Sequence, residues 1–468
     1  MDRTDSVFLT LIVYNAVLIG VGLWARSRNK GVEDYFLAGR GLGPWVAAIS
    51  ASASSSSAWT LLGVSGAAYA WGLPALWIFP ATVGGFMLNW LWVAPRLKEL
   101  AQAERAVTLS EVVVPATLGP KRKQILRIAA AIIVFCFIFY IASQFEAAGK
   151  AFESVFELSK HASIMIGAAI VLAYTLLGGF WAVSVTDSIQ GILMVVASVA
   201  LPVVALSAVG GFGALLDGLH VMGAGGSPIG TGTLVGVFFV LGLFGIGLGY
   251  PGQPHVVNRF MALKDEQALH QGRVIAIGWA VVVYSGMLLL GLSARVLFAD
   301  LGDSEQVLFH VATELLPALV SGVMVAAVLS AIMSTADSQL LVAASAISYD
   351  WNLTSRQEQH GLRRTRTTVV AVLILATVLA LVWQADIFSR VLFAWSAAGS
   401  AFGPLLIMRL LGRSVSPAAT RLAMLTGFGL TVFISLFPDT PGDVAERLVP
   451  FFVALAIAAA GQQKAQSA

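Results

Sequence analysis

Apolar stretches of about 20 residues recur along the whole sequence, and they limit the possible folds more than any other feature. Each stretch is long enough to cross a hydrocarbon core of about 30 Å as a helix. Only 11% of the 468 residues are charged, whereas a typical soluble domain has about 25%. A transmembrane β-barrel would show short segments of alternating polarity instead. The sequence therefore predicts an all-α polytopic membrane protein without a soluble domain, embedded in a lipid bilayer.

We predict about thirteen transmembrane helices from these apolar stretches. The predicted spans are 6–25, 42–72, 75–95, 125–147, 160–179, 183–208, 232–251, 270–293, 316–346, 367–384, 389–411, 420–436 and 446–461. The charge around the first span follows the apolar run, whereas a cleavable signal peptide carries it in front. The whole chain, 1–468, is thus predicted to form a single membrane domain.

The placement of lysine and arginine predicts the orientation of these spans. If the N-terminus lies outside, 22 of the 28 Lys and Arg residues fall in the inside segments. Inside segments of membrane proteins carry this excess of positive charge. With an odd number of spans, the C-terminus is then expected inside.

Two spans are interrupted, and they stand at matching positions of two halves. Residues 50–59 read SASASSSSAW within the second span, and residues 247–254 read GLGYPGQP at the end of the seventh. Interrupted helices at corresponding positions indicate a transporter's binding site at the membrane midplane. Each set of five spans has an odd number, so the two copies have opposite orientations. We therefore expect a first repeat at 42–208 and a second at 232–411, with extra spans at 6–25 and 420–461.

Other motifs give no support for an enzyme. Gly247, Gly249 and Gly252 match a dinucleotide-binding fingerprint, but neither a preceding β-strand nor a correctly spaced acidic residue accompanies them. The sequence contains no H-E-x-x-H and no G-x-S-x-G motif. The net charge of +3 reflects the membrane topology and does not indicate nucleic-acid binding.

A candidate cation site lies in the ninth predicted span. Ala331, Ser334, Thr335 and Ser338 follow one another at helical spacing and share one face. Carbonyl and hydroxyl oxygens suit Na⁺, although such hydroxyls can also bond back to their own helix.

Two acidic residues, Asp187 and Asp337, lie at membrane depth in the predicted spans. A carboxylate near a helix centre costs about 2.5–3.5 kcal/mol on insertion scales, so it usually has a function. A purely structural hydrogen-bonding role is the alternative for both.

Several longer motifs resemble the sodium/solute symporter family, especially its sodium/proline branch. The resemblance extends from about residue 33 to residue 411. It is carried by DYFLAGRGLG (34–43), SASASSSSAW, GGFWAVSVTDSIQ (178–190), GLGYPGQPHVVNRFM (247–261), SAIMSTADSQLL (330–341) and AWSAAGSAFGP (394–404). The resemblance implies a LeuT-type fold of two inverted five-helix repeats, in agreement with the span count.

The resemblance also implies which residues bind the ions and the solute. The main Na⁺ site is implied at Ala53, Ser56, Ala331, Ser334 and Thr335, and a second cation or proton position at Asp187, Ser334, Asp337 and Ser338. Solute-facing positions are implied at Ser57, Trp59, Tyr140 and Tyr250, with Pro254 shaping the break. Two positions depart from the proline branch, which has an aspartate at Ser55 and a tryptophan at Ile246.

We therefore expect Na⁺-coupled symport of a small organic solute in a bacterial inner membrane. A proline-like amino acid, another small carboxylate or a polar solute would fit. Two alternatives remain open at this stage. One is a H⁺-coupled carrier that uses Asp187 and Asp337, and the other is a transporter-like sensory module that acts with a separate signalling partner.

Overall fold

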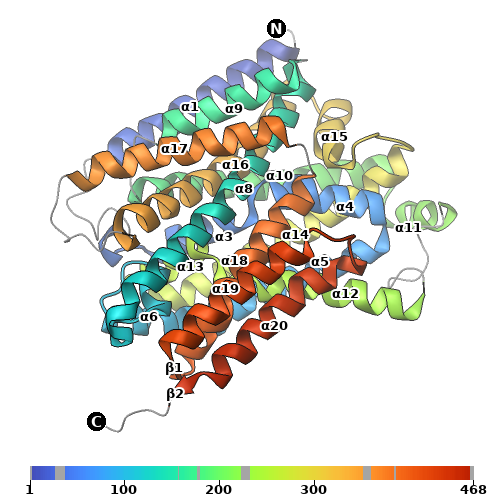
Figure 1. Cartoon of the computed structure of the whole chain (residues 1–468). Helices are drawn as coiled ribbons and strands as arrows, with labels where there is room; N and C mark the ends of the chain where they lie inside the picture. Colours follow the sequence, from blue (N-terminus) through green and yellow to red (C-terminus); the bar gives the residue numbers. More distant parts are fainter. Residues whose placement is uncertain are drawn as a thin grey trace.

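A computed structural model describes residues 3–26, 37–156, 158–175, 180–222, 232–351, 360–383 and 386–463, and this part of the chain is a bundle of long helices (Figure 1). A helix lies at each of the thirteen predicted spans. They are α1 (Arg3–Arg26), α3–η2–α4 (Pro44–Ala58, Trp59–Gly63, Val64–Trp71), η3–α5–η4–α6 (Leu73–Trp77, Ile78–Met87, Leu88–Val93, Ala94–Ala103), α8 (Arg122–Phe156), α9 (Lys160–Thr175), α10 (Phe180–Val209), α12 (Thr233–Leu248), α14 (Glu266–Leu297), α16 (Ala318–Ser345), α17 (His360–Val382), α18 (Ile387–Leu410), α19 (Pro417–Ile434) and α20 (Val444–Ala460).

The length and composition of these helices suit a membrane. Within the described ranges, eight helical segments are long and apolar enough to cross one, and shorter apolar helices include Asp5–Val21, Lys160–Leu172 and Thr367–Val382. The last residues of the predicted span 160–179, from 176 onward, lie outside the described residues. So do Arg28, Lys30, Arg356 and Lys464, which contributed to the predicted inside charge.

The first predicted break is a left-handed backbone conformation inside α3. Ser57 has φ 38° and ψ −174°, a region that residues with a side chain rarely adopt. The chain then continues through the π-helical turn η2 into α4. The break releases backbone N–H groups, and side chains accept them. Ala58 N donates to Gln144 Oε1 at 3.0 Å, and Trp59 N donates to Ser57 Oγ at 3.1 Å.

The second break follows α12. The membrane-length segment here, Leu234–Gly252, agrees with the predicted span 232–251 to within two residues. After the tight turn η6 (Tyr250–Gly252), the chain passes through extended Gln253 and resumes as the buried helix α13 (Pro254–Met261). Gln253 Nε2 donates to the carbonyls of Gly249 (3.1 Å) and Trp395 (2.8 Å), so the interrupted backbone is again satisfied by side chains.

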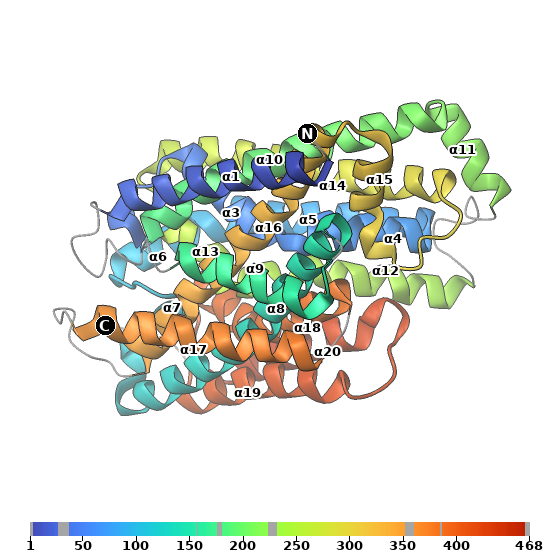
Figure 2. The same cartoon turned by 90° about the horizontal axis from the view of Figure 1, so that it is seen from above.

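The broken helix α3 lies in the interior of the bundle. It packs against α10, α14, α16 and α13. Seen from above, α3 and α16 lie between a layer that contains α1, α10 and α14 and a layer that contains α17, α19 and α20 (Figure 2). This burial explains how a run of serines is tolerated at membrane depth, since all of their side chains face protein rather than lipid.

Short elements connect the long helices. They include α7 (Leu109–Val113), α11 (Phe212–Val221) and α15 (Val307–Leu315). The strands β1 (Ser414–Val415) and β2 (Gln462–Gln463) pair antiparallel and tie the end of α20 to the start of α19.

At the second break, the backbone packs closely against α18, because glycines face each other at the contact. A Cβ added to Gly252 would lie 2.7 Å from the Cα and 2.8 Å from the carbonyl oxygen of Gly399. Because both contacts are to backbone, neither atom can rotate away.

We expect Gly252→Ala to destabilise the protein by about 1–3 kcal/mol, since the added methyl group overpacks this contact. Thermal unfolding in detergent measures the change. Gly278→Ala in α14 is the matched control, because nothing lies within 4 Å of its added Cβ. Equal melting temperatures for the two variants would contradict the expectation.

Candidate functional site

Oxygen atoms of α3 and α16 meet where the sequence predicts the main Na⁺ site. Ser334 Oγ lies 3.4 Å from the carbonyl oxygen of Ala53 and 3.2 Å from that of Ala331. Thr335 Oγ1 lies 3.1 Å from the carbonyl oxygen of Ser54. All of these residues are fully buried. The arrangement supplies the neutral oxygen ligands that a hard cation prefers.

Ser56, the fifth predicted member of this set, contributes to the π-helical turn. Its carbonyl oxygen accepts the backbone N–H of Trp59 at the start of the π-helical turn. Ser54, which was not predicted, supplies the carbonyl bonded to Thr335 instead. Within the described ranges, no group of three or more His, Cys, Asp or Glu residues could hold a metal ion.

The four residues predicted for a second cation lie next to this oxygen cluster. Ser54 Oγ bridges two of them, because it lies 3.1 Å from Asp187 Oδ2 and 3.0 Å from Ser338 Oγ. Ser338 Oγ in turn donates to Asp337 Oδ1 at 3.4 Å. The fold therefore brings together predicted residues of α10 and α16 that are distant in the sequence.

Arg259 is also in this cluster. It lies between the predicted spans 232–251 and 270–293, and in α13 its side chain is fully buried. Its Nη2 lies 2.9 Å from Asp187 Oδ2 and 2.6 Å from Ser338 Oγ. A charged residue eight positions after a helix break looks like a loop residue, because the sequence gives no sign that the helix resumes inward.

Aromatic residues and hydroxyl groups from several helices meet around the first break. The Tyr140 hydroxyl donates to Ser57 Oγ at 3.3 Å. The Tyr250 and Tyr284 hydroxyls lie 3.2 Å apart, and the Tyr284 ring lies 6.1 Å from Trp59. Tyr and Trp combine a packing face with a polar tip, which suits a small amphipathic solute. The predicted positions Ser57, Trp59, Tyr140 and Tyr250 are thus brought together.

The two positions that depart from the proline branch are both buried. Ser55 Oγ donates to the carbonyl of Ser52 at 2.9 Å, so this serine bonds back to its own helix. The carbonyl of Ile246 accepts the Trp395 indole N–H at 3.0 Å. Pro254 is the first residue of α13, where a proline needs no backbone hydrogen bond.

Three further residues of the aromatic cluster were missed from the sequence: Gln144 in α8, Tyr284 in α14 and Trp395 in α18. Gln144 binds the backbone freed at the first break, and Trp395 packs on Tyr250 with ring centroids 4.7 Å apart. A polar or aromatic residue inside each apolar span was the available signal. Nothing in the spacing shows that these three spans meet.

A charged network around Glu305 holds the start of α18 in place beside Trp59. The Glu305 carboxylate accepts the backbone N–H groups of Ile387 (3.1 Å) and Phe388 (2.8 Å) and pairs with Lys150 at 2.7 Å. Phe388 lies over Trp59, with ring centroids 5.7 Å apart. The start of α18 is thereby held over the aromatic cluster.

Asp303 belongs to the same network and pairs with Lys150 at 2.7 Å. Burial alone would raise the pKa of Asp303. The hydrogen bond and the charge of Lys150 outweigh that effect and hold this pKa below its usual value.

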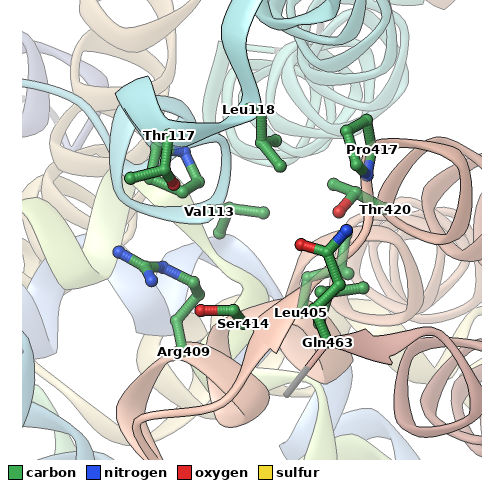
Figure 3. A pocket seen from close by; sticks show the side chains of 11 residues that line it. Val113, Thr117, Leu118, Leu405, Arg409, Ser414, Pro417, Thr420 and Gln463 are labelled. Atoms are coloured by element: carbon green, nitrogen blue, oxygen red, sulfur yellow. The ribbon is translucent and has the colours of Figure 1, made fainter. Parts of the chain in front are cut away.

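A cavity of about 630 Å³ lies elsewhere, among η5 (Ala116–Lys121), α18, α19 and the C-terminal strand (Figure 3). Thr117, Arg409, Thr420 and Gln463 are among its lining residues. None of its lining residues was predicted to bind an ion or solute, and it is separate from the serine break.

Sequence comparison identifies the family of the chain. Residues 35–427 match the sodium:solute symporter family. The high-affinity proline transporter PutP of Bacillus subtilis is 32% identical over 458 residues, which cover 94% of this chain and 96% of that protein. A sodium/proline symporter of Staphylococcus aureus is 34% identical over 442 residues, which cover 91% of this chain and 85% of that protein.

Solved structures support the fold. A Na⁺-coupled sialic acid symporter in its substrate-bound outward-open state superposes with a TM-score of 0.81 at 15% identity, over 99% of this chain and all of the other. Mhp1, a nucleobase-cation-symport-1 transporter in a closed conformation, superposes with a TM-score of 0.56 at 12% identity, over 90% of this chain and 93% of the other.

The chain is an all-helical, multi-span membrane protein with a LeuT-like fold. The chain belongs to the sodium:solute symporter family. It is therefore a multi-pass cell-membrane protein that couples solute transport to Na⁺, and it is not an enzyme. The expectation of Na⁺-coupled symport is confirmed, and the H⁺-coupled carrier and the sensory module are set aside.

We expect Tyr284→Phe to weaken solute binding several-fold. The change keeps the ring against Trp59 and removes the hydroxyl that contacts Thr60 and Tyr250. Loss of such a hydrogen bond costs about 0.5–1.5 kcal/mol. The solute dependence of Na⁺-driven uptake measures the effect. Tyr69→Phe, which loses a bond to the Phe298 carbonyl far from the breaks, should leave this dependence unchanged, and an equal effect in both variants would contradict the assignment.

Proposed function

We propose that this protein takes up L-proline or a closely similar small amino acid together with Na⁺. The observation that carries the proposal is the convergence of Ser57, Trp59, Tyr140, Tyr250 and Tyr284 at the first break, in a chain whose relatives include named proline transporters. The aromatic faces suit an apolar ring, and the hydroxyl groups suit the polar end of an amino acid.

We propose the main Na⁺ position between α3 and α16, with Ala53, Ser56, Ala331, Ser334 and Thr335 as its ligands. Hydroxyl-to-carbonyl distances of 3.1–3.4 Å across the two helices support the contributions of Ala53, Ser334 and Thr335. A Na⁺ ion there would join one helix of each proposed repeat, 42–208 and 232–411. Asp187, Ser334, Asp337 and Ser338 form the proposed position for a second cation or a proton.

The distribution of lysine and arginine supports an outside N-terminus and an inside C-terminus. With thirteen spans in this orientation, inward Na⁺ movement would use the membrane potential, which adds about 2.3 kcal/mol per charge per 100 mV. Transport would proceed by alternating access, with Na⁺ and solute each raising the affinity for the other by the same factor.

Removal of the two hydroxyls tests the Na⁺ position. We expect Ser334→Ala and Thr335→Ala to lose most Na⁺ stimulation of uptake, because each removes a cation ligand from a site that has no carboxylate among its proposed ligands. Uptake into proteoliposomes over a range of Na⁺ concentrations measures the loss. Ser330→Ala in the same helix is the control, since its hydroxyl bonds to Ala326 and Tyr14. Normal Na⁺ dependence in both test variants would refute the position.

Ligand-dependent thermal stability tests the solute. We expect L-proline to stabilise the purified protein with Na⁺ present and to have little effect when choline replaces Na⁺. At a concentration 100 times the dissociation constant, the stabilisation is about 2.7 kcal/mol. A panel of other amino acids, small carboxylates and sugars is tested in parallel. If one of them stabilises in a Na⁺-dependent way and proline does not, the proline assignment is wrong although symport stands.

A further inference from the structure

We propose that Arg259 is the resident cation of the acidic cluster beside the Na⁺ position, so that this chain couples one Na⁺ to each solute. The cluster consists of Asp187, Asp337 and Ser338 together with Ser50 and Ser54, which contact Asp187. The inference rests on the proposed function, because it takes the position between α3 and α16 as the Na⁺ site. It assigns the second cation position proposed above to this side chain and not to a second Na⁺, and so adds a residue that determines how many ions are transported.

Arg259 contacts the atoms that a second cation would need. Its Nη2 lies 2.9 Å from Asp187 Oδ2 and 2.6 Å from Ser338 Oγ. Two of the four groups proposed for a second cation are therefore already bound to one positively charged nitrogen. A Na⁺ ion could use the same oxygens only if the guanidinium group moved away.

The remaining donors of Arg259 hold it in this position. Nε donates to Ser50 Oγ at 3.0 Å, and Nη1 donates to the carbonyl of His255. The guanidinium also lies over the Phe180 ring, 5.0 Å from its centroid. A planar guanidinium with five N–H donors can bind all of these acceptors at once, whereas a lysine would provide a single charged nitrogen.

The net charge of the cluster favours the binding of one further cation and opposes a second. Asp187 and Asp337 are both fully buried, and Arg259 is the positive residue placed between the α10 and α16 sides of the cluster. With both carboxylates ionised, the three side chains sum to a single negative charge. One Na⁺ bound nearby would balance that charge, and a second would leave an unpaired buried positive charge, which is unfavourable.

The same contacts connect the ion positions to the second break. Arg259 lies in α13, directly after that break, whereas Ser50 lies in α3, Asp187 in α10 and Ser338 in α16. A rearrangement of the break would shift α13 and move the guanidinium relative to Asp187. Arg259 thus contacts the cation cluster and is a positioning residue for it.

The number of Na⁺ ions per solute tests the proposal. We reconstitute the wild-type protein and three variants, Arg259→Gln, Arg259→Lys and Asp187→Asn/Arg259→Gln, in proteoliposomes. The Na⁺-to-solute ratio is obtained from reversal potentials with L-proline, or with the solute that the stability screen identifies. We expect a ratio of about one for the wild type and about two for Arg259→Gln, with a Hill coefficient that rises toward the number of sites. The double variant should return to about one, because it also lacks the Asp187 carboxylate that the loss of Arg259 frees for a second Na⁺.

The controls separate this role from a purely structural one. Arg447→Gln removes another fully buried arginine, paired with Asp443 at 2.5 Å in the C-terminal helices, and should leave the ratio at about one. Arg259→Lys should also keep it, because the charge remains. A wild-type ratio of two, or active Arg259→Gln protein with an unchanged ratio, overturns the inference.

If Arg259→Gln does not fold, the wild-type ratio still decides. Failure of the proposed function is seen separately, as absence of Na⁺-stimulated uptake in the wild type.

Discussion

The structure depends on one constraint: a helix interrupted at membrane depth must have its released backbone groups bonded by protein. At Ser57 the backbone turns left-handed, and Gln144 and the Ser57 hydroxyl accept the freed N–H groups. At the second break Gln253 donates to two carbonyls, and Asn89 Nδ2 donates to the Tyr250 carbonyl at 3.3 Å. Gln144 and Asn89 come from helices that surround the breaks, so the bundle must be assembled before the breaks are fully bonded.

A second consequence of burial concerns charge. The acidic residue Asp187 would be costly at this depth without a partner, and the structure provides Ser50, Ser54 and Arg259 around one of its oxygens. Because these partners come from α3 and α13, they connect α10 to both interrupted helices. The proposed ion-binding region is therefore part of the framework that holds the breaks together.

The sequence predicted what depends on local pattern and missed what depends on convergence. Apolar length placed a helix at each of the thirteen spans, serine and glycine–proline runs located the two breaks, and helical spacing put Ser334, Thr335 and Ser338 on one face. The burial of Arg259 was not predicted, because the chain after a break can lead to the surface or back into the core, and hydropathy does not distinguish these cases. Tyr284 and Gln144 were missed because a single polar group in an apolar span does not show which other spans it will face.

The short segment from Ala53 to Ser57 offers a physical route for coupling. Its carbonyls at Ala53 and Ser54 contact the α16 hydroxyls, and three residues later the Ser57 hydroxyl contacts Tyr140 in the aromatic cluster. An ion that draws these carbonyls toward α16 also fixes the backbone at Ser57, because the unusual φ and ψ there leave few alternative conformations. Solute bound at Ser57 would in turn reduce the freedom of the same carbonyls. Each ligand would then lower the cost of ordering the segment for the other, which is the reciprocity that thermodynamic linkage requires.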